Sequence, residues 1–238
     1  MRIHPLFKQF GSSWSATRAG LYPEPEYNTI VEHYAGSAGY SLNFCEKNVY
    51  LYDTDQHITA LWSWLIHWAK PQDILDIPIG LPEGTNILSL NLMHGQALLL
   101  KHWQRTNNVG DCWTISSWGN KPGQWTANTR ARVAEEVQAI KHWAILPAKP
   151  YLCAEMTHFV DPPYAGNYAY KQPPIDHAEL GRRCLAGRGQ IIVCEGLAKD
   201  GTPPTWLPFR PAGKRVTSRR KANQSHHRME YIWTNEVT

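Results

Sequence analysis

The feature that most constrains the fold is a strand, a glycine-rich turn and a helix that follow one another near the N-terminus. Residues 29–32 are β-branched and apolar before they reach a charge, which is typical of a strand. Residues 34–39 contain Gly36 and Gly39, and residues 40–44 can continue as a helix. This order opens a nucleotide-binding βαβ unit, in which glycines let the backbone pass close to a ligand. The chain therefore begins as an α/β fold.

An acidic residue ends the next predicted strand, which covers residues 49–52. Asp53 follows Glu32 at about the 20-residue spacing that places a carboxylate on a ribose. Asp55 stands two residues further on, and capping of the following helix would explain either acid. We favour the ribose for Asp53 and the helix cap for Asp55. That helix ends at Pro71, and its tryptophan stripe is more typical of core packing than of a ligand box (Trp62, Trp64, Trp68).

A second motif lies far along the chain, where an apolar run over residues 157–160 ends in Asp161-Pro162-Pro163-Tyr164. The pattern predicts a buried strand that two prolines stop. Each proline fixes φ and removes a backbone donor, so the turn is stiff and some carbonyls have no ladder partner. Such a turn presents a carboxylate, carbonyls and an aromatic face together, which suits an exocyclic amino group on a flat ring. A plain strand-ending turn explains the tetrapeptide about as well.

Composition excludes several classes of protein. The 238 residues suffice for one well-cored domain with a modest insertion. No run approaches 18 uncharged apolar residues, and the N-terminus lacks the apolar stretch of a secretory signal. Five cysteines without CxxC spacing predict free thiols in a reducing cytoplasm. The eleven histidines show no ligand spacing, so we expect no metal site.

Two stretches have the composition of nucleic-acid contacts. Residues 105–128 are polar, rich in glycine and dotted with tryptophan, and such side chains read base edges or stack on bases. Trp118 and Lys121 are the candidates there, although a loop lying over the protein has the same composition. Between Lys214 and Arg228 there are six Lys or Arg, two His and no acidic residue. We expect a basic loop that contacts phosphate, with a solvated loop as the alternative. Its densest part is Arg219-Arg220-Lys221.

The rest of the sequence predicts three more helices and three more strands. Helices are predicted over residues 87–103 and 129–142, and from a capping box at Asp176–Glu179 to about Ala186. Strands are predicted over residues 143–146, 190–195 and 229–234.

In this order the pieces resemble the D12 class of DNA adenine-N6 methyltransferases, the Dam-like enzymes of phages and bacteria. Phe10-Gly11-Ser12-Ser13-Trp14 is similar to the family's N-terminal "GGKW" or "GSKW" element. The stretch from Glu32 to Gly39 looks like the donor loop, usually "EPFxGxGG". Asp53 stands where the family has the acid after its second strand, and residues 161–164 are similar to its catalytic corner. Four matches in the family's order cover nearly all of the chain outside the middle segment.

The chain departs from the family pattern at three positions. The lysine of the first loop is Ser13, and Lys8 and Arg18 are the candidates for replacing its charge. The proline after the donor-loop glutamate is His33, and the usual phenylalanine is Tyr34, which keeps the ring.

The resemblance implies a Rossmann-like S-adenosylmethionine-dependent methyltransferase sheet with helices on both faces. The catalytic core would comprise residues 1–70 and 144–238. Residues 71–143 would be an inserted, partly helical target-recognition region. The long interval between Gly39 and Asp161 fits this arrangement. It disfavours the small ribosomal RNA guanine-N2 methyltransferases, which reach a similar corner sooner.

The resemblance also implies a mechanism. S-adenosylmethionine would lie over the glycines, in contact with residues of the first loop, the donor loop and the second strand (Phe10, Gly11, Ser12, Ser13, Trp14, Glu32, Tyr34, Ala35, Gly36, Gly39, Asp53, Asp161). The adenine would be flipped out of double-stranded DNA. Asp161 and the Pro162 carbonyl would accept hydrogen bonds from N6, Pro163 would stiffen the turn and Tyr164 would stack on the base. Trp118, Lys121, Arg219, Arg220 and Lys221 would contact the DNA.

Two alternatives stay open. One is an RNA base-amino methyltransferase, because the corner recognises an amino group on a ring and not the polymer. The other is a catalytically impaired DNA-binding protein on the same fold, because of Ser13. The recognition sequence, a paired restriction nuclease and the oligomeric state do not follow from the sequence, and a monomer is compatible with it.

Overall fold

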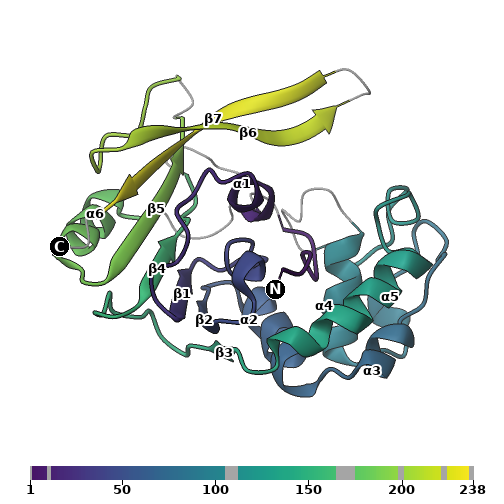
Figure 1. Ribbon diagram of the computed structural model, residues 1–238. Coiled ribbons are helices and arrows are strands. Elements are labelled where there is room, and N and C mark those ends of the chain that lie inside the picture. The colour runs from purple at the N-terminus through teal and green to yellow at the C-terminus, as the bar shows by residue number, and fades with distance from the viewer. Residues whose placement is uncertain are drawn as a thin grey trace.

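A seven-stranded sheet organises the computed structural model, which describes residues 2–9, 12–104, 112–164, 175–197, 201–220 and 224–235 (Figure 1). Of residues 215–220 and 224–228 it describes the backbone alone. The strands are β1 (Thr29–His33), β2 (Asn48–Tyr52), β3 (Ala144–Ile145), β4 (Thr157–Val160), β5 (Gln190–Gly196), β6 (Arg210–Arg220) and β7 (Gln224–Thr234).

The order of the strands is β3-β2-β1-β4-β5-β7-β6. The first five are parallel to their neighbours, in the order of the doubly wound Rossmann sheet. Strand β7 lies antiparallel between β5 and β6, which is the arrangement of the Rossmann-like methyltransferase sheet. The predicted fold class is therefore confirmed.

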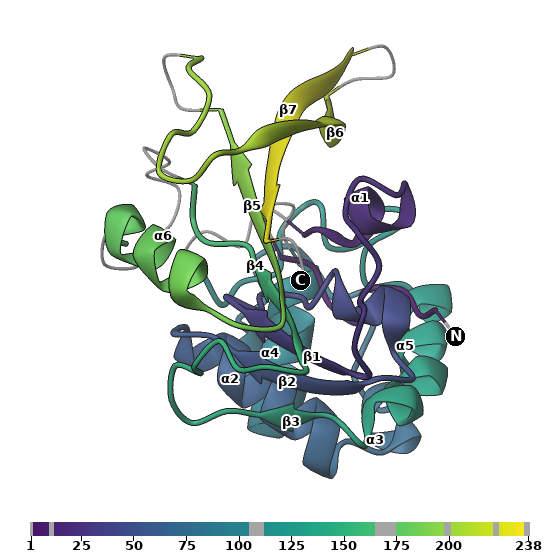
Figure 2. The same ribbon diagram turned by 60° about the vertical axis from the view of Figure 1, so that its left-hand side comes forward.

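The two faces of the sheet carry separate clusters of buried side chains. Successive residues of a strand point to opposite faces. In β5, Ile192 and Cys194 join the larger cluster, whereas Ile191 and Val193 join the smaller one. The smaller cluster contains Leu180 and Cys184 of α6 (His177–Ala186), and the larger one contains residues of α2 (Gln56–Ser63). Helices thus cover both faces, and Figure 2 shows α6 and α2 on different sides of the strands.

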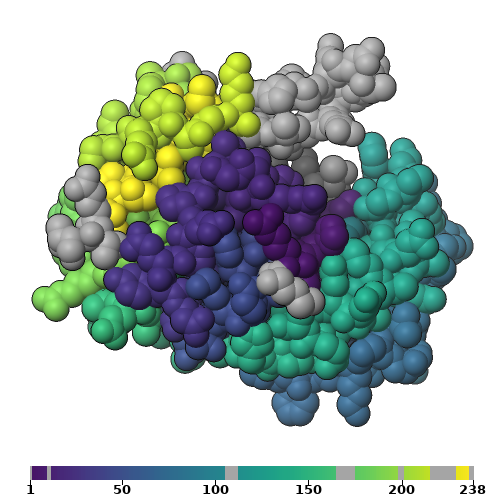
Figure 3. Space-filling model, in the orientation of Figure 1, coloured from purple at the N-terminus to yellow at the C-terminus, as the bar shows by residue number. Residues whose placement is uncertain are grey.

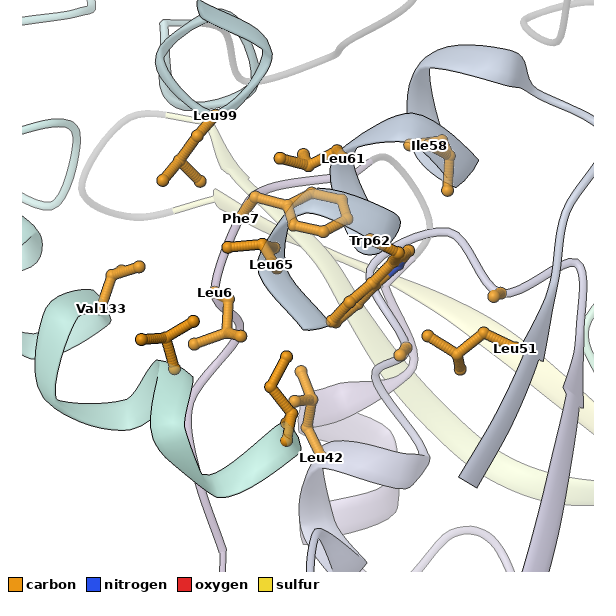
Figure 4. Packing of buried hydrophobic residues seen from close by; sticks show 14 of the residues in the cluster. Leu6, Phe7, Leu42, Leu51, Ile58, Leu61, Trp62, Leu65, Leu99 and Val133 are labelled. Carbon is orange, nitrogen blue, oxygen red and sulfur yellow. The ribbon is translucent and has the colours of Figure 1, made fainter. Parts of the chain in front are cut away.

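The larger cluster joins three parts of the chain in one core. Figure 4 shows Leu6 and Phe7 of the N-terminal segment beside Leu61 and Trp62 of α2, with Leu99 of α4 nearby. Residues 71–143 lie between β2 and β3 and contain α3 (Pro71–Leu75), η3 (Ile87–Ser89), α4 (His94–Trp103), α5 (Ala127–Glu136) and η4 (Val137–Ile140). This segment shares its apolar interior with the sheet, and its role in target recognition stays a prediction.

Several helices differ from their predicted bounds. The helix predicted over residues 87–103 begins at His94, because the side chain of Gln96 accepts a hydrogen bond from the backbone N–H of Met93 (2.9 Å) and so fixes the start. The helix predicted over residues 129–142 begins at Ala127 and tightens into η4 after Glu136. Residues 40–44 form only a 3₁₀ turn, η1 (Ser41–Phe44), and a five-residue α1 (Trp14–Arg18) precedes β1.

The tryptophan stripe is only partly in the core. Trp62 and Trp64 are buried, but Trp68 is 72% exposed. Helix α2 continues as a π-helical turn, η2 (Trp64–Trp68), which is wider than an α-helical turn. The extra residue in the turn rotates Trp68 away from the face that the 3.6-residue period assigns to it.

The predicted basic loop between Lys214 and Arg228 is wrong, because these residues lie largely in the hairpin of β6 and β7. Strand β7 pairs with β5 only from Glu230 to Thr234, and the rest of it pairs with β6 alone. Residues 214–228 show no apolar alternation in the sequence, and that alternation is the signal that identifies a strand. Figure 1 shows the ribbon reaching away from β5.

No helix within the described ranges is long and apolar enough to cross a membrane. The five cysteines are free thiols. No group of three His, Cys, Asp or Glu side chains in the same ranges is arranged to hold a metal ion.

Candidate active site

The candidate site lies where the sheet changes direction. Strands β1 and β4 are neighbours, but the chain continues from β1 to β2 on one side and from β4 to β5 on the other. In open α/β sheets the crevice at such a switch point is where ligands bind. Residues 34–39, called here the glycine loop, follow β1, and residues 161–164, called here the Pro-Pro corner, follow β4. Both therefore end up at the same crevice.

A cleft of about 650 Å³, counting the part open to solvent, lies at this point. Its lining contains most of the predicted site residues, namely Ser12, Ser13, Glu32, Tyr34, Ala35, Gly36, Gly39, Asp53, Asp161, Pro163 and Tyr164. Gln9, Ser37, Asp55 and Ile58 also line the cleft and were not predicted to do so. Four segments far apart in sequence thus converge on one cavity.

Four predicted residues of the site do not line the cleft or lie outside the described residues. Trp14 does not line the cleft, and its indole N–H donates to the Ile3 carbonyl (2.8 Å). Pro162 is buried beneath the corner. Phe10 and Gly11 lie outside the described residues.

The glycine loop is held in a strained backbone conformation. Tyr34, Gly36 and Ala38 have φ values of 57°, 48° and 51°. Glycine adopts this left-handed region freely, whereas each non-glycine residue there costs on the order of 1–3 kcal/mol. The N–H of Gly36 donates to Asp53 Oδ2 and the Trp62 indole donates to the Gly36 carbonyl, both at 2.8 Å. These two hydrogen bonds hold the peptide groups on either side of Gly36 and keep the loop in this conformation.

Gly39 lets the N-terminal segment pack on the glycine loop. A Cβ atom at this position would lie 2.4 Å from the backbone nitrogen of Trp14 and 2.8 Å from that of Ser13. Real Cβ atoms do not approach backbone so closely, so only glycine fits. Figure 3 shows the N-terminal segment, in purple, between the helical segment and the sheet.

Glu32 is a buried acid at the floor of the cleft. Its Oε2 atom accepts hydrogen bonds from the backbone N–H of Ser41 (3.1 Å) and from the Ser41 hydroxyl (2.5 Å). Burial raises the pKa of Glu32 to about 8, and the negative charge of Asp161 adds to the rise. The Ser41 hydrogen bonds oppose this shift without cancelling it. Glu32 is therefore mainly protonated at neutral pH.

Asp53 and Asp55 divide their roles as the spacing suggests. Asp55 accepts a hydrogen bond from the backbone N–H of His57 (2.8 Å) and caps α2, as predicted. Asp53 lines the cleft and holds the glycine loop, and its Oδ1 atom accepts from the Asp55 N–H (2.9 Å). Its contact with a ribose stays a prediction.

The Pro-Pro corner is supported by α6 and the strands beyond it. His177 Nε2 lies 3.2 Å from the Pro163 carbonyl oxygen. A carbonyl only accepts, so this nitrogen carries the proton. The same nitrogen is 3.8 Å from Glu195 Oε2, which also accepts from the Trp206 indole (3.1 Å). The side chain of Tyr164 donates its hydroxyl proton to Glu230 (2.6 Å).

Two buried polar atoms in the cleft lack a hydrogen-bond partner within the described part of the chain. They are the hydroxyl oxygen of Ser37, a residue only 3% exposed, and the amide oxygen of Gln9. A buried polar atom without a partner costs about 1–3 kcal/mol. The cleft is therefore suited to a polar ligand. Ser37 was not predicted as a site residue, and its position inside the glycine loop is the sequence signal that could have identified it.

Trp118 and Lys121, two of the residues predicted to bind nucleic acid, do not line the cleft. Trp118 is 50% exposed, and Lys121 Nζ lies 3.9 Å from the centre of its ring. The backbone of Arg219 and Arg220 belongs to β6, and Lys221 lies outside the described residues. All five contacts stay predictions.

Neither cation proposed to replace the missing lysine lines the cleft. Lys8 Nζ donates to the Gly123 carbonyl (2.7 Å) and to Gln124 Oε1 (2.8 Å). Arg18 lies over the Trp14 ring at 5.2 Å. Both positive charges are thus directed to structural contacts.

Comparison with known proteins adds little to this picture. No protein-family model matches the chain, and no curated protein matches it. Among solved structures it is similar to the glycopeptide N-methyltransferase MtfA in complex with S-adenosyl-L-homocysteine. The match covers 94% of this chain and 74% of that one at 9% sequence identity, with a TM-score of 0.35. Because this TM-score is low, the match is not used to support the fold, and the fold assignment rests on the order of the strands.

Proposed function

We propose that the protein is an S-adenosylmethionine-dependent methyltransferase that acts on adenine N6 in double-stranded DNA. The observation that carries the proposal is the convergence of the glycine loop and the Pro-Pro corner on one cleft at the switch point of the sheet. One side of this cleft has the glycine-loop backbone and hydrogen-bond acceptors that suit a nucleoside. The other side has the Asp161 carboxylate and the Tyr164 ring of the Pro-Pro corner. The resemblance to the D12 class supports the same assignment.

The donor side of the cleft fits the cofactor. Gly36 and Gly39 keep the loop free of side chains, and Asp53, Ser37 and Gln9 offer oxygen atoms that accept hydrogen bonds. S-adenosylmethionine, when bound, supplies an electrophilic methyl group. Glu32 would face this positively charged ligand, and its ionised form would then be favoured.

The acceptor side positions the target amine. The Asp161 carboxylate and the Pro162 carbonyl would accept its two N–H bonds, so that the nitrogen lone pair is directed into the cleft. Tyr164 would stack on the ring and hold its plane. No strong base is required, because the amine loses its proton after the new bond has made it acidic. The contribution of these residues is mainly orientation.

A base inside a duplex cannot reach this cleft and must be flipped out, at a cost of a few kcal/mol. The ribbon of β6 and β7 and the Trp118–Lys121 pair are the proposed contacts for the DNA backbone and bases. Basic side chains on phosphate would make binding strongly dependent on salt.

The test is transfer of a labelled methyl group from S-adenosylmethionine to unmethylated plasmid DNA, with structured RNA in parallel. We expect N6-methyladenine in the DNA, and a loss of at least about 100-fold for Asp161→Ala, because the amine is no longer oriented. Binding of S-adenosylhomocysteine, measured by calorimetry, should stay within a few-fold.

The matched control is Asp76→Ala, which removes an exposed carboxylate that accepts a hydrogen bond from Gln72 on α3. Full activity of Asp161→Ala would overturn the proposal. Methyl label found in RNA alone would support the methyl-transfer reaction but would show that the substrate is RNA and not DNA. The two are distinguishable because folded RNA presents different grooves from duplex DNA.

A further inference from the structure

A buried glutamate on the last strand binds the aromatic residue of the Pro-Pro corner. Glu230 of β7 is 1% exposed, and its Oε1 atom accepts hydrogen bonds from two tyrosine hydroxyls. One belongs to Tyr164 (2.6 Å) and the other to Tyr22 (2.7 Å), which precedes β1. Two hydroxyl groups from distant parts of the chain thus meet at one buried carboxyl oxygen.

The neighbour of Glu230 in the sheet makes room for the same ring. Gly196 of β5 pairs with Glu230 across the β5–β7 ladder. A Cβ atom at position 196 would lie 2.5 Å from Cδ2 and 2.7 Å from Cε2 of Tyr164. One residue of the pair therefore gives space to the ring, and the other holds its hydroxyl. Together they form a seat for the Tyr164 side chain.

The opposite edge of β7 is irregular at the same level. Strand β6 pairs Pro211 with Tyr231 and Gly213 with Glu230, so Ala212 is an extra residue in a bulge. Gly213 has a φ of 142°, and a Cβ atom there would lie 2.8 Å from the side chain of Leu21. Bulges redirect side chains next to functional sites. This one brings the base of the ribbon against the segment that carries Tyr22.

We infer that Glu230 is a positioning residue that fixes the ring plane of Tyr164 at the mouth of the cleft. The inference rests on the proposed function, in which this ring stacks on the target base. Tyr164 is only partly buried. Without the hydrogen bond to Glu230, its side chain would rotate more freely and would no longer keep one preferred orientation. A ring that is already held in place loses less side-chain entropy when a base stacks on it, so more of the stacking free energy is available for binding.

The experiment compares Glu230→Gln, Tyr164→Phe and the double variant in single-turnover methyl transfer at saturating DNA. Each single change should lower the rate about 10-fold, because either one weakens or removes the anchoring bond. The double variant should be about as slow as Tyr164→Phe, since without its hydroxyl Tyr164 no longer bonds to position 230, whichever residue stands there. Affinity for S-adenosylhomocysteine and for DNA should change less than about threefold.

The matched control is Tyr40→Phe, which removes another buried tyrosine hydroxyl, one that donates to the Pro23 carbonyl (2.9 Å). It should leave the transfer rate unchanged. A second measurement needs no turnover: ¹³C relaxation of labelled tyrosine rings should show that the Tyr164 ring becomes more mobile in Glu230→Gln.

The outcomes separate the two proposals. A wild-type rate for Glu230→Gln, or losses that multiply in the double variant, would overturn the role of Glu230. An unchanged Tyr164 ring order in Glu230→Gln would do so as well. If the wild-type protein transfers no methyl group to any nucleic acid, the proposed function fails, and the ring measurement still decides whether Glu230 anchors Tyr164.

Discussion

The glycine loop and the Pro-Pro corner end adjacent parallel strands and face one cleft, but they are held in different ways. The glycine loop is bound by residues close to it in sequence. Ser41 binds the glutamate before it, and Asp53 and Trp62 bind the two sides of Gly36. The corner is held by residues further along the chain. His177 binds the Pro163 carbonyl, and Glu230 binds the Tyr164 hydroxyl.

This difference shows how the glycine loop and the Pro-Pro corner are each made rigid. The βαβ unit folds as a local structure, so the loop inside it carries its own support, including two strained non-glycine residues. The corner follows a strand in the middle of the sheet and obtains its support only after α6 and β7 have packed beside it. The first half is a local unit, and the second depends on the complete sheet.

The largest effect is expected from Gly39→Ala, which tests the rigidity of the glycine loop. The added methyl group would overlap backbone atoms of Trp14 and Ser13, which cannot move aside as a flexible side chain can. We expect a loss of more than about 3 kcal/mol in the free energy of unfolding and loss of detectable donor binding. Denaturant unfolding and calorimetry with S-adenosylhomocysteine measure the two effects.

Gly84→Ala is the control for this substitution. Gly84 has a φ of 83°, but a Cβ atom there meets nothing within 4 Å. Gly84→Ala should lower the free energy of unfolding by only about 1 kcal/mol, because alanine is less stable than glycine in the left-handed conformation, and it should leave donor binding intact. Equal effects of the two substitutions would show that contact with the N-terminal segment does not matter.

An intermediate effect is expected from Glu32→Gln, which tests the electrostatic link between the two halves. Between the ordinary pKa of 4.5 and the raised value of about 8, the unfolded chain ionises Glu32 while the folded chain keeps it protonated. The folded state then binds more protons, so the contribution of Glu32 falls as pH rises, by about 1.4 kcal/mol per pH unit.

Glutamine does not titrate, so the variant should gain stability relative to the wild type from pH 5 to pH 8. Urea unfolding at several pH values measures this difference. Parallel stability profiles for the two proteins would contradict a raised pKa. Addition of Asp161→Asn to the wild type should make its profile shallower, because one cause of the raised pKa is removed.

The smallest effect is expected from His177→Phe, which removes one hydrogen bond from the corner and keeps a ring beside Trp206. We expect a loss of about 1 kcal/mol in stability and a fall of about threefold in methyl transfer. Arg182→Ala on the same helix is the control, because its ion pair with Glu179 is exposed. A loss of donor binding in His177→Phe would show that the two halves of the site are not independent.

Local patterns in the sequence predicted much of the site. The positions of β1 and β2, the cap at Asp55 and the strand before Asp161 agree with the structure. These features depend on residues within one or two elements, where backbone periodicity and capping act. The spacing between Glu32 and Asp53 likewise predicted two residues that line the cleft.

Other residues had no local signal. Glu230 belongs to a stretch whose pattern predicts a closing strand, and nothing in it indicates that its carboxylate reaches Tyr164. The ribbon of β6 and β7 was predicted as a loop because residues 214–228 show no apolar alternation, although their backbones pair as strands. Trp68 appeared to be in the core because a π-helical turn cannot be distinguished from an α-helical one by spacing.

By itself the sequence determined which strands end at the turns that line the cleft, because prolines, glycines and capping acids act on the backbone within a few residues. Only the tertiary structure decided which side chains support the corner. The order of the strands places β7 between β5 and β6, and this places Glu230 next to Gly196 and within hydrogen-bond distance of Tyr164. Contacts across a sheet depend on strand order and register, and those are set by the packing of the whole chain.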